Sequence, residues 1–548
     1  MALTSTDGDT GGEAGKTAPG ARAPGGPYPP LHPYLSRLGR LSPRLAPLGA
    51  VAGGVTLAAS FPPVGAWALA PAGPAVLALL LRGRRLRAAF MLGLLFGLAF
   101  FLPLLSWLTN LAWYAWVALA VAEALVFAVL GVAQRLLLYL RAWPLAVAAW
   151  WVAAEAVRDR WPYAFPWGRL AMSQAGGPAV RWVAVGGPPL LSFLLALTGT
   201  TIAWALTSPA RHRLLPALAV AATAGLTLAG GLLPVDPQPA APPTAVVAAV
   251  QGDVPHARDL PALLRATTVT ANHAAATRHL AVRVSAGAEP APDLVVWPEN
   301  STDLDPRLYP DVFADIASAV AAVDRPVLVG EVLQDPQRNV GQIWTPSQGP
   351  GPVYVKRQLV PFGEYIPFRG LLAHVTSLVA LQPRDFTAGH RVVVFHVGQI
   401  RLGDVICYEV GFDNLVASDV GAGANLLAMQ TNDATFEVDG QRGETLQQLG
   451  MARVRAVEYD RAVVVASTTG VSAIIAPDGR LLAHSGTWQQ AVLEARVPLL
   501  TYRTLAARAG AWPEYAAVAL TLLALACAIT IALRRRQPAP TRDGDQLS

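Results

Sequence analysis

Apolar runs long enough to cross a bilayer follow one another through the first half of the chain and return once near its end. A membrane-spanning helix needs roughly 20 predominantly apolar residues. The candidate spans are Leu45–Phe61, Trp67–Leu81, Ala88–Leu108, Trp113–Ala133, Ala142–Val157, Pro188–Leu206, Leu215–Leu233 and Tyr515–Leu533. The pattern predicts a polytopic α-helical membrane domain at residues 39–235 with seven spans, and an eighth span at residues 510–535.

Residues 239–505 show a different pattern, in which short β-prone runs alternate with amphipathic helical stretches. The expected strands are Ala245–Gln251, Leu294–Trp297, Val327–Val332, Val392–Val397, Ile400–Cys407, Asn425–Gln430, Ala462–Ser467 and Ala473–Ala476, with hairpin-like segments in Gln342–Leu359. The expected helices are Asp259–Val284, Pro310–Val323 and Arg442–Tyr459. Alternating elements of this kind predict an inserted α/β domain built as a layered sandwich.

The composition is also typical of a membrane protein. Of the 548 residues, 53% are hydrophobic and 14% are charged, and the mean hydropathy is +0.39. The formal net charge of +6 would suggest a nucleic-acid partner only if the basic residues clustered on a soluble face. They are instead arginines between the apolar runs, so we expect the lipid bilayer as a partner and no nucleic acid.

The charges of the loops predict an orientation, because loops rich in Lys and Arg stay on the cytoplasmic side. Basic residues precede the first span and follow every second span: Arg37, Arg40, Arg44; Arg82, Arg84, Arg85, Arg87; Arg135, Arg141; Arg211, Arg213; Arg534, Arg535, Arg536. The alternate loops Pro62–Ala66 and Thr109–Ala112 carry no charge. We predict that residues 239–505 are extracytoplasmic and that both termini are cytoplasmic, as a disordered tail at 1–38 and a tail at 536–548.

The outward loop Arg158–Arg169 breaks this pattern, because it is charged, aromatic and interrupted by prolines. Trp161 and Trp167 would suit an aromatic belt at the membrane interface. Alternatively, the loop is a re-entrant or interfacial segment that shapes a lipid-facing site. Glu123 and Glu155 lie in or near apolar spans, where a carboxylate is costly unless it is paired or hydrated.

The candidate chemistry begins with Cys407. The only other cysteine, Cys527, lies inside the last apolar run, which excludes a disulfide framework. The β-prone run Arg401–Ile406 should carry Cys407 to the carboxyl end of a strand, where α/β folds place reacting groups. Taken alone, such a cysteine is more often a small buried hydrophobe than a nucleophile.

Two further polar groups are predicted at strand ends. Glu299 follows an apolar strand, where burial would suit it to act as a base. Lys356 is one of only two lysines among 42 lysine and arginine residues, which favours a role that a compact, proton-exchanging ammonium can fill and a guanidinium cannot. Glu299 alone would be a strand-end cap or salt bridge and Lys356 alone a surface charge. Together with Cys407 they predict a shared site.

These residues occur in motifs that resemble the Glu-Lys-Cys set of the nitrilase superfamily: Trp297–Glu299, Lys356–Pro367 and Ile406–Glu409. The sequence Leu-Val-Pro-Phe-Gly-Glu-Tyr inside the second motif, together with the eight-span frame, resembles the apolipoprotein N-acyltransferases, the membrane branch of that superfamily. The likeness covers residues from about 40 to 535 and includes Phe165–Trp167, Val250–Gly252 and Met451–Glu458. Each motif alone is weak evidence for the family, but the order of the motifs within this topology is specific to it.

The resemblance implies a nitrilase-like α-β-β-α sandwich and roles for individual residues. It implies Glu299 as the general base, Lys356 as the cation that faces the tetrahedral oxyanion, and Cys407 as the nucleophile. It also implies supporting roles for Glu364, Glu409 and Tyr408. The sequence departs from the family pattern at Asn300, where many relatives have a small hydroxyl residue, and at Gln448, where some have histidine.

The activity that the resemblance implies is transfer of an acyl chain from a membrane phospholipid, through a thioester on Cys407, to the amino-terminal diacylglyceryl-cysteine of an apolipoprotein. No cofactor or metal is expected, because the nine histidines are scattered and no His-Glu-x-x-His motif is present. Two alternatives stay open. One is a membrane-tethered amidase that hydrolyses its thioester, and the other is a transporter or lipid-binding scaffold with an inactive nitrilase-like domain, against which the intact Glu299, Lys356 and Cys407 weigh.

Overall fold

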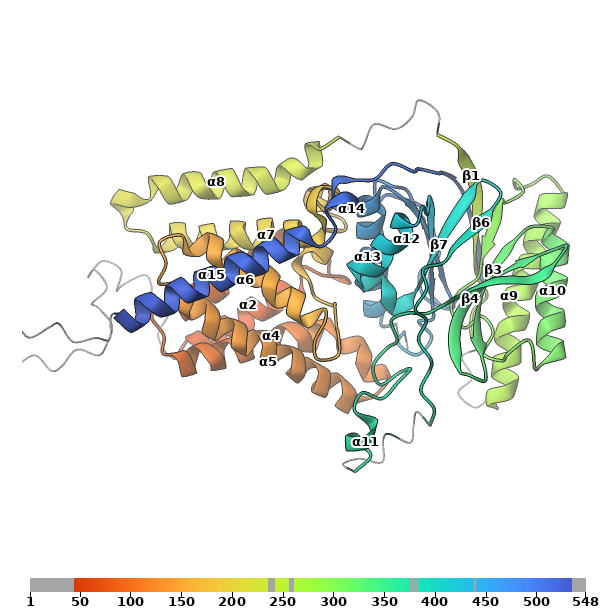
Figure 1. Cartoon of the computed structure of the whole chain (residues 1–548), viewed down its shortest axis with the longest axis horizontal. Coiled ribbons are helices and arrows are strands. Elements are labelled where there is room, and N and C mark those ends of the chain that lie inside the picture. Colours follow the sequence, from red (N-terminus) through yellow and green to blue (C-terminus); the bar gives the residue numbers. More distant parts are fainter. Residues whose placement is uncertain are drawn as a thin grey trace, which may run out of the picture.

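The computed structural model describes residues 44–234, 242–255, 261–374, 379, 383–437 and 440–534. Within these residues the chain forms a helical bundle and a two-sheet sandwich that lie end to end (Figure 1). The sandwich is inserted between helices α8 (Leu214–Leu228) and α15 (Trp512–Arg534) of the bundle. The tails predicted at 1–38 and 536–548 lie outside the described residues.

Each predicted span overlaps one α-helix of the bundle. The other six are α2 (Ala46–Ala58), α3 (Ala72–Leu81), α4 (Leu86–Leu104), α5 (Trp113–Leu137), α6 (Trp143–Arg158) and α7 (Val183–Thr207). In the described part of the chain, five segments are helical, long and apolar enough to cross a membrane: Leu86–Leu104, Trp113–Leu137, Pro178–Thr207, Leu214–Leu232 and Trp512–Arg534. These helices confirm the prediction that the chain is a membrane protein. The count of eight spans stays a prediction, because α2, α3 and α6 have only 13, 10 and 16 residues.

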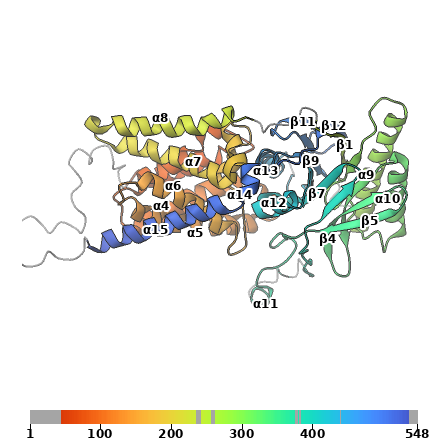
Figure 2. The ribbon, with the colours of Figure 1, turned by 45° about the horizontal axis from the view of Figure 1, so that its top comes forward.

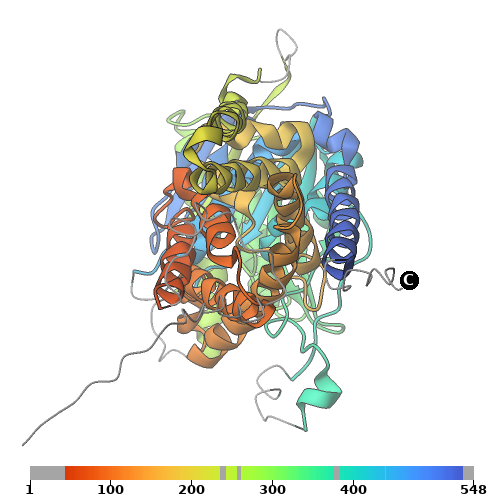
Figure 3. The same ribbon diagram turned by 90° about the vertical axis from the view of Figure 1, so that its left-hand side faces the viewer.

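The last helix of the chain packs on one side of the bundle. Seen end-on in Figure 3, α15 (blue) lies on the side opposite α2 (red). An ion pair of 2.7 Å between Arg160 and Glu514 joins the loop after α6 to the first turn of α15. The segment after the sandwich thus returns to the same end of the bundle that the segment before it left.

Two six-stranded sheets form the sandwich, with strand orders β12-β1-β2-β3-β4-β5 and β11-β10-β9-β8-β7-β6. The strands are β1 (Thr244–Gln251), β2 (Leu294–Val296), β3 (Val327–Leu333), β4 (Arg338–Thr345), β5 (Gly349–Val355), β6 (Val394–Val397), β7 (Ile400–Ile406), β8 (Leu426–Thr431), β9 (Ala462–Ser467), β10 (Ala473–Ile475), β11 (Leu481–His484) and β12 (Ala491–Pro498). β1–β3 are mutually parallel, as are β7–β9, and the other neighbours are antiparallel. All the predicted strands form, whereas β11 and β12 were not predicted.

Helices cover both outer faces of the sandwich (Figure 2). α9 (Ala262–Ser285) and α10 (Pro310–Val323) pack on the first sheet, and α12 (Asp413–Gly421) and α13 (Gly443–Tyr459) pack on the second. Val247, Leu402 and Ile406 are among the apolar side chains that fill the space between the sheets. The predicted α-β-β-α arrangement is therefore confirmed. Two short helices, α11 (Arg369–Leu372) and α14 (Leu505–Ala509), lie in the connections.

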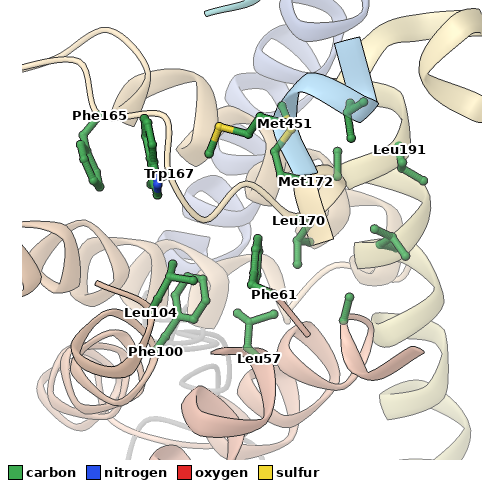
Figure 4. Packing of buried hydrophobic residues seen from close by; sticks show 14 of the residues in the cluster. Leu57, Phe61, Phe100, Leu104, Phe165, Trp167, Leu170, Met172, Leu191 and Met451 are labelled. Carbon is green, nitrogen blue, oxygen red and sulfur yellow. The ribbon is translucent and has the colours of Figure 1, made fainter. Parts of the chain in front are cut away.

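The helical layer of the second sheet also packs on the bundle. Met451 of α13 belongs to one continuous apolar cluster with Phe61 and Phe100 of the bundle (Figure 4). Gln447 of α13 donates from Nε2 to the carbonyl oxygens of Pro62 (3.1 Å) and Leu104 (2.9 Å). Polar and apolar contacts together thus fix the bundle-side face of the sandwich against the membrane helices.

Candidate active site

Three strand ends meet at one edge of the sandwich. Glu299 follows β2, Lys356 follows β5 and Cys407 follows β7. The Nζ atom of Lys356 lies 2.9 Å from Oε1 of Glu299, and the charges of both groups act on the Cys407 thiol. The three residues are 5%, 1% and 8% exposed, respectively, so the structure brings them together in a buried site between the two sheets.

Two carboxylates hold the ammonium group of Lys356, and one amide holds these carboxylates. Besides its contact with Glu299, Nζ lies 3.0 Å from Oε1 of Glu364. Asn339 of β4 donates from Nδ2 to the same two oxygens, at 2.7 Å for Glu299 and 2.8 Å for Glu364. Because an ammonium has three N–H groups, these contacts leave one N–H of Lys356 without an acceptor among the described residues. That N–H can face the oxygen of a bound substrate.

The charge of Lys356 is secured by its surroundings. Burial alone would lower the pKa of this lysine, but the negative charges of Glu299 and Glu364 outweigh burial and raise its pKa well above the usual value. Lys356 is therefore a permanent cation at neutral pH. A fixed positive charge in a low-dielectric site is suited to stabilising a developing oxyanion.

The Cys407 thiol is protonated in the resting site. Burial raises the pKa of this thiol most, the negative charge of Glu299 raises it further, and Lys356 opposes both, so that its pKa stands well above the usual value. The backbone of Cys407 has φ +51°, a left-handed conformation that is uncommon outside glycine. Such strained residues cluster at functional sites, where the surrounding structure holds them in place. The sharp turn after β7 presents the sulfur at the strand end.

A polar network from α13 reaches the sulfur. Nε2 of Gln448 lies 3.5 Å from Sγ of Cys407 and also bonds a carboxylate oxygen of Glu444. The hydroxyl of Thr431, at the end of β8, donates to Oε1 of Gln448 at 2.9 Å. The sequence marked Gln448 only as a departure from the family pattern and did not predict its contact with Cys407. The sequence signal that could have indicated this contact is the position of Gln448 on a predicted helix, three residues before Met451.

Glu409 joins the cysteine turn to the lysine strand. Its carboxylate accepts hydrogen bonds from the backbone N–H groups of Ile406 (2.8 Å), Arg357 (2.7 Å) and Gln358 (3.1 Å), and from the Tyr354 hydroxyl at 2.9 Å. The carboxylate therefore ties residues on either side of Lys356 to the residue before Cys407. Glu409 positions the two groups rather than reacting itself, since its oxygens are fully occupied.

Tyr408 forms a wall between the site and the bundle. Its hydroxyl donates to the carbonyl oxygen of Ala164 at 2.6 Å, and its ring stacks on Trp167 with a centroid distance of 5.4 Å and an interplanar angle of 15°. Phe165 and Phe412 flank the same ring. The loop between α6 and α7 thus contributes directly to the surroundings of the residue next to Cys407.

This loop is anchored at both ends by ion pairs. Arg158 pairs with Glu123 and donates to the carbonyl oxygen of Trp167. Arg169 pairs with Asp413, the first residue of α12, through two contacts of 2.8 and 3.0 Å. Of the two tryptophans expected at the interface, Trp161 is 69% exposed, as an aromatic belt requires, whereas Trp167 is 2% exposed and packs beside the site. The segment is therefore a structural part of the site as well as a connector.

Comparisons with known proteins agree with this architecture. The family model of the apolipoprotein N-acyltransferase N-terminal domain matches residues 53–201, and that of carbon-nitrogen hydrolases matches residues 246–507. The chain is 38% identical to an apolipoprotein N-acyltransferase of Mycolicibacterium smegmatis, over 87% of this chain and 84% of the relative. It is 32% identical to one of Pseudomonas putida, over 71% and 73%. Among solved structures it is similar to a nitrilase-superfamily amidase of Nesterenkonia, with 16% identity, coverage of 47% and 92%, and a TM-score of 0.35.

Proposed function

The chain belongs to the apolipoprotein N-acyltransferase family, and from this membership we propose that it N-acylates the amino-terminal S-diacylglyceryl-cysteine of apolipoproteins, with a membrane phospholipid as the acyl donor. The observation that carries the proposal is the buried contact between Lys356 and Glu299 beside the Cys407 thiol. An amine acyltransferase that works through a thioester needs a nucleophile, a base and an oxyanion partner, and this site supplies one of each.

In the first half-reaction the ester bond of the phospholipid is replaced by a thioester. Glu299 takes the proton of the Cys407 thiol, and the sulfur attacks the ester carbonyl. The free N–H of Lys356 stabilises the oxyanion of the tetrahedral intermediate. When the intermediate collapses, the C–O bond breaks, Glu299 returns the proton to the leaving oxygen, and a lysophospholipid departs. The raised pKa of Cys407 supports a base-assisted attack, because little thiolate is present before substrate binds.

In the second half-reaction the α-amine of the acceptor attacks the thioester carbonyl. The new C–N bond forms, the C–S bond breaks, and the proton lost by nitrogen passes through Glu299 to the Cys407 sulfur. The burial of the site favours this outcome over hydrolysis, since water competes with the amine for the thioester. The apolar wall formed by Tyr408 and Trp167 faces the bundle, where an acyl chain would lie.

We further propose the topology that the loop charges indicate. Eight helices cross the bilayer, seven from residues 39–235 and one from residues 510–535. Residues 239–505 form the catalytic domain on the extracytoplasmic side, with both termini in the cytoplasm. This placement would put Cys407 near the outer leaflet, where both lipid-anchored substrates are held.

Mass spectrometry of the Cys407 peptide tests the chemistry. After incubation of the full chain with phospholipid, a fatty acyl mass should appear on this peptide and disappear when an acceptor lipopeptide is added. The Cys527→Ala variant, altered on the exposed face of α15, should behave like the parent, whereas Cys407→Ala should acquire no label. Loss of the acyl group without acceptor would identify the competing amidase activity, and labelling of Cys407→Ala would refute the assignment.

A labelling experiment tests the topology separately. In a Cys527→Ala background, Ser347→Cys places a thiol in the exposed β4–β5 turn, and Arg85→Cys places one in the exposed loop before α4. A membrane-impermeant maleimide should label the first variant in intact spheroplasts and the second only after lysis. The reverse result would overturn the orientation without affecting the proposed chemistry.

A further inference from the structure

A second open site lies at the opposite end of strand β7 from Cys407. It is a crevice of about 710 Å³ whose walls include Arg401, Asn425, Asp460 and Tyr502. Arg401 lies near the start of β7 and Cys407 follows its end, so with a rise of about 3.3 Å per residue their backbones are roughly 20 Å apart. The crevice is therefore separate from the catalytic centre and has no part in the proposed chemistry.

The crevice and the residues immediately around it carry an excess of positive charge. Burial lowers the pKa of Arg461 to about 10, and although Asp460 opposes this shift, the positive charges of Arg401 and Arg503 add to it. Three guanidinium groups therefore share this region with the single carboxylate of Asp460. A guanidinium whose pKa falls because of neighbouring cations would be stabilised by an added anion.

The guanidinium of Arg401 has a buried N–H group that lacks a partner among the described residues. Its Nε is buried, and no acceptor is found for it in the described part of the chain. Arg461 differs, because its donors are used by the carbonyl oxygens of Ala424 (2.8 Å), Tyr459 (3.0 Å) and Tyr502 (2.8 Å). These acceptors are neutral, so they satisfy the N–H groups of Arg461 without adding negative charge. The donors of Arg461 are therefore used within the protein, whereas Arg401, which lines the crevice, is available to bind a ligand.

The crevice adjoins the segment that leads back into the membrane. Tyr502 belongs to the linker between β12 and α14, and Figure 1 shows this blue segment passing from the sandwich to α14 at the end of the bundle. The guanidinium of Arg508, in α14, lies 5.1 Å from the Tyr502 ring centroid. Helix α15 follows, and Trp512 and Tyr515 at its start are 73% and 55% exposed, as aromatic side chains at a membrane interface are.

We propose that this crevice binds a phosphate group at the membrane surface, with Arg401 as its principal ligand. Arginine pairs with phosphate through two parallel N–H···O bonds, and basic pockets beside membrane helices bind lipid headgroups in this way. The same chemistry admits a free phosphate ion, so the source is decided by experiment. The site would hold a lipid that is not the one being cleaved, because Cys407 is out of reach of its ester bonds.

Isothermal titration of the full chain in a nonionic detergent tests the proposal, with dioctanoyl-phosphatidylglycerol and inorganic phosphate as probes. Removing one charge-assisted contact should weaken binding by about 10- to 100-fold, so Arg401→Gln should lose affinity by this factor. Arg480→Gln is the matched control, because Arg480 has a 70% exposed side chain on a turn away from the crevice. Tighter binding of the lipid than of phosphate identifies a headgroup site, and equal binding identifies a free-phosphate site.

The result that would overturn the proposal is equal affinity of Arg401→Gln and the parent for both probes. Arg401 makes no hydrogen bond through its buried Nε, so the variant should fold, and an unchanged melting temperature checks this. Formation of the acyl group on Cys407 should persist in Arg401→Gln. The phosphate site and the proposed acyl transfer can therefore fail independently of each other.

Discussion

The two helix pairs that cover the sandwich occupy equivalent layers but have different surroundings. On α10, the buried residues form one stripe, Val312, Ile316, Ala319, Val320 and Val323, and the opposite face is exposed. On α13, nearly every residue from Glu444 to Tyr459 is buried, because the second sheet covers one face and the bundle covers the other. The same layer of the fold is thus a surface in one half of the molecule and an interior in the other.

This difference explains the buried charges of α13. Arg455 pairs with Asp413 at 2.6 Å and with Glu458 at 2.5 Å, and it donates to the carbonyl oxygens of Val410 and Gly411. On the exposed pair, Arg278 of α9 makes a single bond of 3.0 Å to Ser318 at the surface. The clamped helix needs partners for its charged groups within the protein, because nearly all of its residues are buried. The same helix supplies Gln448 to Cys407, so the bundle supports the catalytic turn.

The largest effect should come from a residue on the sheet that faces away from the bundle. If the chemistry needs both sheets, Glu299→Gln should slow formation of the acyl-enzyme by about 10²- to 10⁴-fold, because the general base is lost. Single-turnover labelling with radioactive phospholipid measures this rate. Asp315→Asn on α10, a carboxylate away from the site, should leave the rate unchanged. A normal rate in Glu299→Gln would contradict the assignment of Glu299 as the general base.

The next effect concerns stability. Arg455→Ala should lower the free energy of unfolding by about 3–5 kcal/mol, because it leaves the buried carboxylates of Asp413 and Glu458 without their cation. Arg278→Ala, the counterpart on the exposed helix pair, should change it by less than about 0.5 kcal/mol. Denaturant titration followed by tryptophan fluorescence compares the two variants. Similar losses in both would show that the two helix pairs are supported alike.

Buried carboxylates on the two sides of the sandwich should also make the free energy of unfolding depend on pH in opposite directions. Burial raises the pKa of Glu331, on β3 of the first sheet, to about 7, and the charge of Asp305 adds to this, while the Trp344 indole and the charge of Arg307 oppose it. Its contribution to stability is therefore full below the unfolded pKa of about 4.3 and is lost as pH rises through 7. Glu331→Gln should remove this dependence and be the more stable protein at pH 8, by up to about 3 kcal/mol.

Asp413 on the clamped side should behave in the reverse way. Although burial raises its pKa, Arg169 and Arg455 lower it more, so the folded-state pKa lies well below the usual value. Its contribution is present above the unfolded pKa of about 3.9 and is lost as pH falls through the folded value. Unfolding curves of Glu331→Gln and Asp413→Asn from pH 3 to 8 should diverge at opposite ends of this range. A loss at the same end would contradict the assigned causes.

The sequence predicted where the strands end better than it predicted how the helices that cover the sheets are packed. Apolar runs that stop at Glu299 and Cys407 were readable because each strand ends where a polar group begins, and the motif around Lys356 placed the third group. The contacts of Asn339 and Gln448 were not readable, since they depend on how β4 and α13 pack on distant elements. The burial of α13 was equally hidden, because its sequence resembles that of a surface helix. β12 was missed because its partner, β1, lies at the other end of the domain.

The smallest effect should come from the contact through which the bundle reaches the catalytic turn. Tyr408→Phe removes the hydrogen bond to Ala164 but keeps the ring that stacks on Trp167. We expect a loss of about 1 kcal/mol in unfolding free energy, the net contribution of one hydrogen bond. Tyr309→Phe, at the residue before α10, is the matched control and should change less.

The decisive measurement on Tyr408→Phe is how stability and rate change together. If the loop only braces the fold, the acyl-enzyme should form at the parental rate once the protein is folded. If the loop positions the Cys407 turn, the rate should fall by up to about 10-fold at temperatures where the variant is fully folded, since 1.4 kcal/mol in the barrier corresponds to that factor. The second outcome would mean that contact with the membrane helices sets the geometry of the nucleophile, which the exposed helix pair has no means to do.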